Sequence, residues 1–102
     1  MSDPVKGIAN RIKRRCDALA PIMVPHERSD PWQSVLFDGG RHRIELSLRG
    51  TRVAEALEAL QAEIAMGDFA IPGHLVAEIH VAAVNCDKDE ALVTLDALTI
   101  KS

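Results

Sequence analysis

The sequence predicts an α+β protein: a two-layer sandwich in which helices cover one face of a four-stranded, mainly antiparallel sheet. Three observations predict it. Apolar residues recur every three or four positions in two segments, which is typical of amphipathic helices. Apolar and polar residues alternate in further segments, which is typical of strands with one buried face. These segments follow one another in the order α-β-β-α-β-β, and 102 residues suffice for one such domain.

A basic amphipathic helix is expected within residues 1–20, running over residues 4–19. Ser2 or Asp3 can cap it, and Pro4 suits the first helical position. Helical spacing places five apolar residues on one stripe: Val5, Ile8, Ile12, Cys16 and Leu19.

Residues 21–31 contain three prolines in eleven positions, so we expect an irregular connecting arm there. Such an arm allows the first helix to pack on its own domain or to reach a second copy. The remaining residues, 32–102, are predicted to form a ββαββ core.

The core is predicted to begin with a β-hairpin made of residues 32–37 and 41–49. In the second strand, Ile44, Leu46 and Leu48 alternate with polar residues. Gly39-Gly40 supplies the backbone freedom that a tight hairpin turn needs. A two-residue turn buries Val35 and Phe37, whereas a three-residue turn buries Trp32 and Leu36; the first is favoured.

A second helix is expected over residues 52–66, capped by Thr51 and ended by Gly67. The glutamates of this segment are expected away from its buried stripe, Glu63 among them. That stripe is made of aliphatic residues: Val53, Ala56, Leu57, Leu60 and Ile64.

The last two strands are predicted over residues 74–84 and 91–100, after a loop over residues 68–73. Placing Ile79 opposite Ala97 aligns both apolar faces and leaves a three-residue loop between the strands. The same register predicts four pairs on the outer face: Val76–Ile100, Glu78–Leu98, His80–Asp96 and Ala82–Thr94. The outer face is then polar in its middle, and Val76, Leu98 and Ile100 form an exposed apolar patch at one end.

Composition excludes several classes of protein. There is no apolar run of ~20 residues, the length that crosses a membrane, and no secretory signal pattern. Two cysteines, Cys16 and Cys86, lie far apart and suggest no disulfide framework. A cytoplasmic location without membrane partners is therefore predicted. We find no dinucleotide, Walker or nucleophile-elbow motif, so no cofactor is predicted.

The candidate catalytic pair is His80 with Asp96, since a carboxylate beside an imidazole can raise its basicity. No activated nucleophile stands nearby, and the favoured interpretation of the pair is an ordinary cross-strand contact. None of the four histidines has the spacing of a metal site, so no metal is predicted.

The leading functional hypothesis is a non-catalytic interaction or assembly module, with itself or another protein as partner and Val76, Leu98 and Ile100 as interface. Charge asymmetry supports association, because bases gather in residues 1–20 and acids in residues 53–96. Two alternatives stay open. Nucleic acid could bind a basic cluster on the first helix: Lys13, Arg14 and Arg15. A small enzyme or ligand binder could use four residues in a cleft: His42, Glu78, His80 and Asp96.

Overall fold

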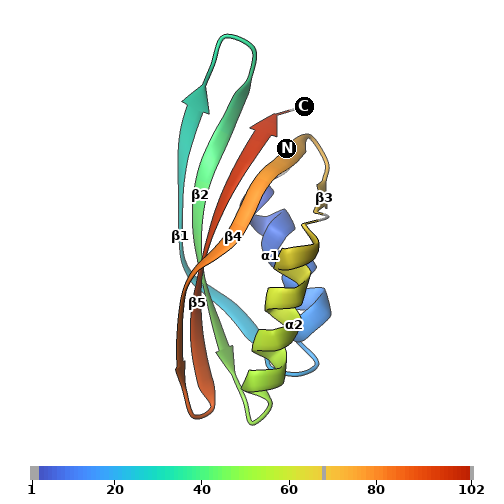
Figure 1. Ribbon diagram of the computed structural model, residues 1–102, viewed down its shortest axis with the longest axis vertical. Coiled ribbons are helices and arrows are strands. Elements are labelled where there is room, and N and C mark those ends of the chain that lie inside the picture. Colours follow the sequence, from blue (N-terminus) through green and yellow to red (C-terminus); the bar gives the residue numbers. More distant parts are fainter. Residues whose placement is uncertain (1–2, 68, 102) are drawn as a thin grey trace.

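The computed structural model describes residues 3–67 and 69–101. Both helices lie on one side of a curled antiparallel sheet with strand order β1-β2-β5-β4-β3 (Figure 1). The helices are α1 (Pro4–Cys16) and α2 (Val53–Met66), and the strands are β1 (Ile22–Gln33), β2 (Asp38–Arg49), β3 (Ala70–Ile71), β4 (His74–Asp87) and β5 (Glu90–Lys101). The α+β class is confirmed. The prediction of four strands is wrong, because part of the expected loop forms β3 and pairs with the start of β4.

Helix α1 begins as predicted and ends earlier. The Asp3 carboxylate accepts a hydrogen bond from the Val5 backbone nitrogen at 2.9 Å, which caps the first turn. The helix ends at Cys16, and the Asp17 side chain then accepts the Ile22 backbone N–H at 3.0 Å, which fixes the entry into β1. Its buried side chains pack into the chain's own core, in line with one of the two predicted options: Val5, Ile8, Ala9, Ile12 and Cys16.

The predicted irregular arm over residues 21–31 is wrong, since most of it belongs to strand β1. This strand lies at the edge of the sheet, where a missing backbone donor can face solvent. Pro31 pairs with Gly40, and Pro25 falls within a register shift of the β1–β2 ladder. The prolines therefore belong to an edge strand and not to the irregular backbone that their number predicts.

The first hairpin turns earlier in the chain than predicted, at residues 34–37, so the predicted strand over residues 32–37 is wrong. The Ser34 backbone nitrogen donates to the Phe37 carbonyl oxygen at 2.8 Å, and the Phe37 nitrogen donates to Ser34 Oγ at 3.0 Å. Both predicted turn registers fail, because Val35 and Leu36 are exposed by 101% and 81%.

Gly39 and Gly40 lie inside β2 and not in a turn. A Cβ at Gly39 would collide with the carbonyl oxygen of Thr99 on β5 and would lie 2.9 Å from the Trp32 indole nitrogen. The glycine is therefore required for close packing between neighbouring strands and the Trp32 ring.

The core is the aliphatic face shared by β2 and β5, as the alternation predicts. Ile44, Leu46, Val93 and Leu95 are fully buried under α2, whose Leu60 is also fully buried. Predicted inward residues Ile79 and Val81 of β4 are partly buried against the same cluster. Helix α2 ends at Gly67 with φ 67°, as expected, but Arg52 and not Thr51 occupies its N-cap, without a side-chain hydrogen bond.

The predicted β4–β5 register is correct in its middle. Glu78 pairs with Leu98, Ile79 with Ala97, His80 with Asp96 and Val81 with Leu95. Register shifts at Ala77 and Ala82 change the pairing on both sides of this stretch.

Because of these bulges, three predicted pairings are wrong. Val76 pairs with Thr99 on the helix-facing side, and Leu75 takes the expected place of Val76 opposite Ile100. Ala83 instead of Ala82 pairs with Thr94, and Asp87 pairs with Glu90, which leaves a two-residue turn. Lys88 in that turn has φ 42°.

Glu63 lies on the buried side of α2, contrary to prediction, and joins the two helices. Its carboxylate is contacted by Arg11 Nε at 2.6 Å and by Arg15 Nε at 3.4 Å. The Glu63 side chain is only 5% exposed, whereas those of Arg11 and Arg15 are 32% and 67% exposed. The Arg11 guanidinium also lies over the Phe69 ring, 5.7 Å from its centroid.

Arg11→Ala is expected to lower the free energy of unfolding by about 2 kcal/mol, because the buried Glu63 loses its short contact. Arg15→Ala is the matched control on the same helix, and its exposed, longer contact predicts a loss below about 1 kcal/mol. Urea denaturation of both variants measures the difference. Equal losses would show that Glu63 does not depend on Arg11.

His42 belongs to a polar network on the helix-facing side of the sheet. Its Nδ1 lies 2.7 Å from Ser29 Oγ and its Nε2 lies 2.8 Å from Thr99 Oγ1. Thr99 Oγ1 donates to the Gly40 carbonyl at 3.5 Å, so a neutral ring with its proton on Nε2 satisfies every group. Burial lowers the pKa of His42 below its ordinary value of 6.5.

The lowered His42 pKa predicts that acid destabilises the fold. The unfolded chain binds the His42 proton more tightly, so this stabilisation is complete above pH 6.5 and is lost as the pH falls toward the folded pKa. His42→Gln removes the titration, so its unfolding free energy should fall less between pH 6.5 and 5. Thermal denaturation against pH gives both slopes, and identical slopes would refute the assignment to His42.

Candidate functional site

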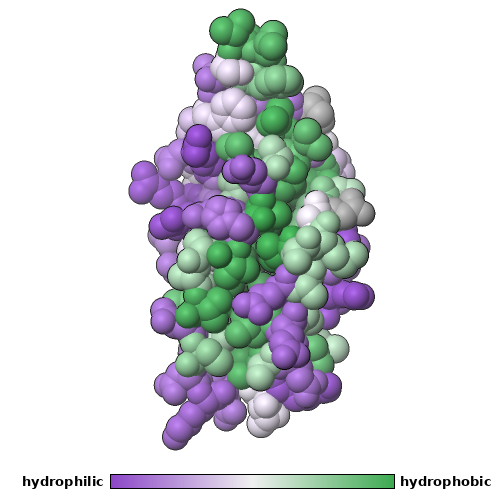
Figure 2. Space-filling view, viewed as in Figure 1, coloured by the Kyte–Doolittle hydropathy of each residue, from purple (hydrophilic) through white to green (hydrophobic). Residues whose placement is uncertain are grey.

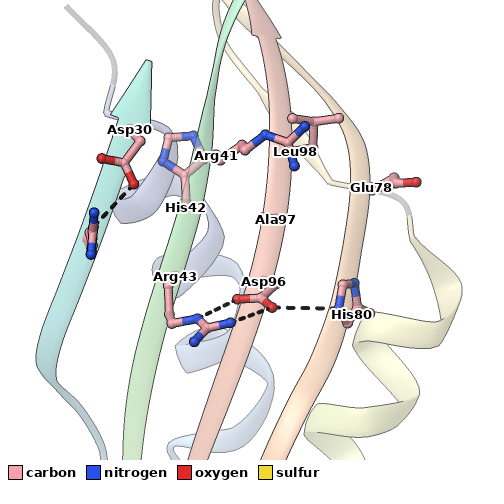
Figure 3. A pocket seen from close by; sticks show the side chains of 10 residues that line it. Asp30, Arg41, His42, Arg43, Glu78, His80, Asp96, Ala97 and Leu98 are labelled. Carbon is pink, nitrogen blue, oxygen red and sulfur yellow. Dashed lines mark hydrogen bonds and ion pairs between the residues drawn. The ribbon is translucent and has the colours of Figure 1, made fainter. Parts of the chain in front are cut away.

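The polar middle of the outer face surrounds a concavity of about 370 Å³ (Figure 3). Three neighbouring strands meet in one row here, since Arg43 of β2 and His80 of β4 both pair with Asp96 of β5. The side chains around it are mostly charged: Arg28, Asp30, Arg41, Arg43, Glu78, His80 and Asp96.

Asp96 is held chiefly by Arg43. The Arg43 Nε and Nη2 atoms donate to the two carboxylate oxygens at 2.9 and 3.0 Å, a bidentate pair. His80 Nε2 lies 3.7 Å from Asp96 Oδ2, on the opposite side (Figure 3). The Arg43 hydrogen bond lowers the pKa of Asp96 below its ordinary value of 3.8, and the same contact raises the pKa of Arg43.

This geometry favours a cross-strand ion pair over a catalytic dyad. The predicted proximity of His80 and Asp96 is correct, but 3.7 Å is longer than a hydrogen bond and Arg43 already neutralises the carboxylate. The residues that line the concavity include no serine, threonine or cysteine. His42 also lines the concavity, so all four residues predicted for a cleft border it: His42, Glu78, His80 and Asp96. His42 is only 6% exposed, and both of its ring nitrogens lie within hydrogen-bond distance of Ser29 and Thr99.

Of the predicted basic cluster, Arg14 and Arg15 line one hollow together with Arg11, Glu63 and Met66, and Lys13 is not among its lining residues. Arg15 contacts Glu63, Lys13 is half-buried, and Arg14 is exposed. All three stand in the last turn of α1, where positive charge stabilises the helix dipole. Nucleic-acid binding through these residues stays a prediction.

Within residues 3–67 and 69–101, no three His, Cys, Asp or Glu side chains gather closely enough to hold a metal ion. Cys16 is buried and Cys86 is exposed. No helix in the described part of the chain is both long and apolar enough to cross a bilayer.

The strongest surface feature is an apolar end of the molecule, which continues from the outer face into the first hairpin tip. Directly paired residues share a face, so Trp32, Ile100 and Leu75 lie in one row with Gly39. The apolar end consists of Trp32, Val35, Leu36, Phe37, Leu75, Leu98 and Ile100. Figure 2 shows apolar side chains crowning this end of the molecule.

The apolar end contains two of the three predicted interface residues. Leu98 and Ile100 lie on the outer face as expected, whereas the Ala77 bulge turns Val76 toward the helices. Leu75 replaces it and is 59% exposed. Sequence reasoning missed the hairpin tip because the turn was placed at Gly39-Gly40.

Comparison with known proteins adds no relative. The chain matches no protein-family model, and searches of curated proteins and of solved structures find no match for it.

Replacing Arg43 with Met is expected to raise the Asp96 pKa toward 3.8, because the bidentate hydrogen bond is lost. A depressed carboxyl pKa stabilises the fold above 3.8 and this stabilisation is lost as the pH falls, so the variant should lose less stability in acid. Carboxyl-carbon NMR titration measures the Asp96 pKa.

The matched control is Arg49→Met, which removes a pair with Glu90 across the same two strands. It should leave the Asp96 titration in place. An Asp96 pKa that stays low without Arg43 would contradict this account.

Proposed function

We propose that this chain is a non-catalytic protein–protein interaction module that serves as a subunit of an assembly. One observation carries the proposal: the apolar end exposes four large side chains, Val35, Leu36, Phe37 and Leu75, next to a half-buried row that adds Trp32, Leu98 and Ile100. Monomeric soluble proteins rarely leave a large contiguous apolar surface in contact with water, whereas interaction sites use such surfaces.

The composition of the apolar end is that of an interface centre. Trp32 and Phe37 are aromatic anchors, the residue class that dominates binding energy. The adjacent row contains Asp30, Arg41 and Glu78, which would form a polar rim. Exposed fractions of 101% for Val35 and 50% for Phe37 indicate that the tip does not serve the core.

The hairpin that presents this surface is stiffened by its own packing. Two twelve-residue strands pair along the hairpin, and Trp32 packs over Gly39. A preformed hairpin loses little conformational entropy when it binds. The partner chemistry that fits is a protein with an apolar groove wide enough for a hairpin tip. A cytoplasmic location fits this role, because the two cysteines remain free thiols.

Site-specific photo-crosslinking in the source cell tests the proposal. A photoreactive residue at Leu36 should give protein adducts, whereas one at the exposed Gln61 on α2 should not. The double variant Val35→Ser/Leu36→Ser should lower adduct or partner recovery at least tenfold with unchanged thermal stability, since both side chains are already in water.

Two outcomes would overturn the proposal. One is the absence of any adduct that is specific to position 36. The other is flotation of the chain with phosphatidylcholine–phosphatidylglycerol vesicles that the double variant abolishes, because the apolar end would then contact lipid.

A further inference from the structure

The two edges of the sheet differ in how well they are protected against pairing. Strand β1 carries Pro25 and Pro31, a register shift and charged residues, all of which discourage an added strand. Strand β3 pairs only with His74 and Leu75, so β4 from Val76 onward has no neighbour on that side among the described residues.

The open part of β4 carries mostly small or aliphatic side chains. Between Val76 and Val84 its only charged or titratable residues are Glu78 and His80. Apolar side chains follow the course of β4 down the face shown in Figure 2. Beside it, a groove of about 500 Å³ separates β4 from the end of α2, lined largely by apolar residues: Ile64, Ala65, Val76, Ala77 and Ile79. Long apolar edges of this kind template the addition of another strand.

We propose that β4 pairs antiparallel with β4 of a second copy, with Ile79 opposite Ile79 of that copy. The result is a homodimer with one continuous sheet through both chains. The inference goes beyond the proposed function because it uses a different surface and a different partner.

Symmetry and sidedness limit the possible registers. A two-fold axis perpendicular to the sheet keeps both helix layers on the same side. Directly opposite residues of the two strands must then share a face, so the axis lies midway between the two copies of one central residue. The regular stretch between the two bulges is Glu78–Val81. Ile79 and His80 lie in the middle of this stretch, so they are the two candidates for the central residue.

The partner that Glu78 meets across the axis decides between these two registers. With Ile79 as the central residue, Glu78 lies opposite His80 of the second copy, and symmetry repeats this pair once. With His80 as the central residue, the two imidazoles lie opposite each other and Glu78 faces Ala82 of the second copy. Opposite partners favour Ile79 as the centre.

Symmetric disulfide trapping tests both the dimer and its register. In a Cys86→Ser background, Ile79→Cys should form an intermolecular disulfide with diamide at micromolar protein, because directly opposite Cα atoms lie ~4.5–5.5 Å apart. Val81→Cys is the matched control, since it is also partly buried on the same face. In the proposed register the two Val81 positions are four residues apart, ~13 Å, which is too far for a disulfide.

A charge-reversal cycle gives a second readout by analytical ultracentrifugation. Glu78→Lys and His80→Glu should each raise the dimer dissociation constant at least tenfold, and the double variant should recover most of that loss. Glu27→Lys on the other edge is the control and should leave the constant unchanged.

Trapping and ultracentrifugation can overturn the inference in three ways: a strictly monomeric wild-type chain, trapping at Val81 instead of Ile79, or no recovery in Glu78→Lys/His80→Glu. The variant Val35→Ser/Leu36→Ser should remain dimeric. If it alone becomes monomeric, the apolar end is the self-contact and β4 is not. A failed crosslink at Leu36 beside an intact β4 dimer would leave this inference standing and remove the proposed function.

Discussion

Burial of one aliphatic sheet face under two helices is the constraint on which the structure depends. Leu46 and Val93 at its centre are fully buried, and α1 and α2 both contribute to the same cluster. Polar groups in this core are satisfied by one another, as His42 and Thr99 are on the sheet, or by arginine, as Glu63 of α2 is. The outer face has no such constraint, so charged and apolar residues can be placed there for other purposes.

Alternation along the strands predicted the centre of this arrangement and failed at its ends for identifiable reasons. The register at Ile79–Ala97 follows from aligning two apolar faces. Ala77 and Ala82 fit either face, so nothing in the sequence indicated that each would form a bulge. Pro25, Pro31 and Gly39 were interpreted by their local preferences, whereas edge position and close strand packing determine their role.

The same division explains what could be predicted of the candidate site. His80 and Asp96 come from consecutive strands joined by a short turn, so parity alone placed them together. Arg43 comes from β2, and its position beside Asp96 depends on the β2–β5 pairing across the intervening helix. Local patterns do not determine that pairing. The residue that decides the chemistry of Asp96 was therefore the one that the sequence could not place.

The bulges at Ala77 and Ala82, which made the predicted pairings at both ends of β4 wrong, also separate the two proposed surfaces. Ala77 turns Val76 inward and Leu75 outward, which joins Leu75 to the apolar end. Ala77 and Ala82 together isolate the regular stretch Glu78–Val81 at the open edge. A two-fold axis perpendicular to the sheet, between the two copies of Ile79, would direct the two apolar ends of a dimer in opposite directions, because the paired strands are antiparallel. Self-association at β4 would thus leave both apolar ends free, and the dimer would present two docking surfaces to its partners.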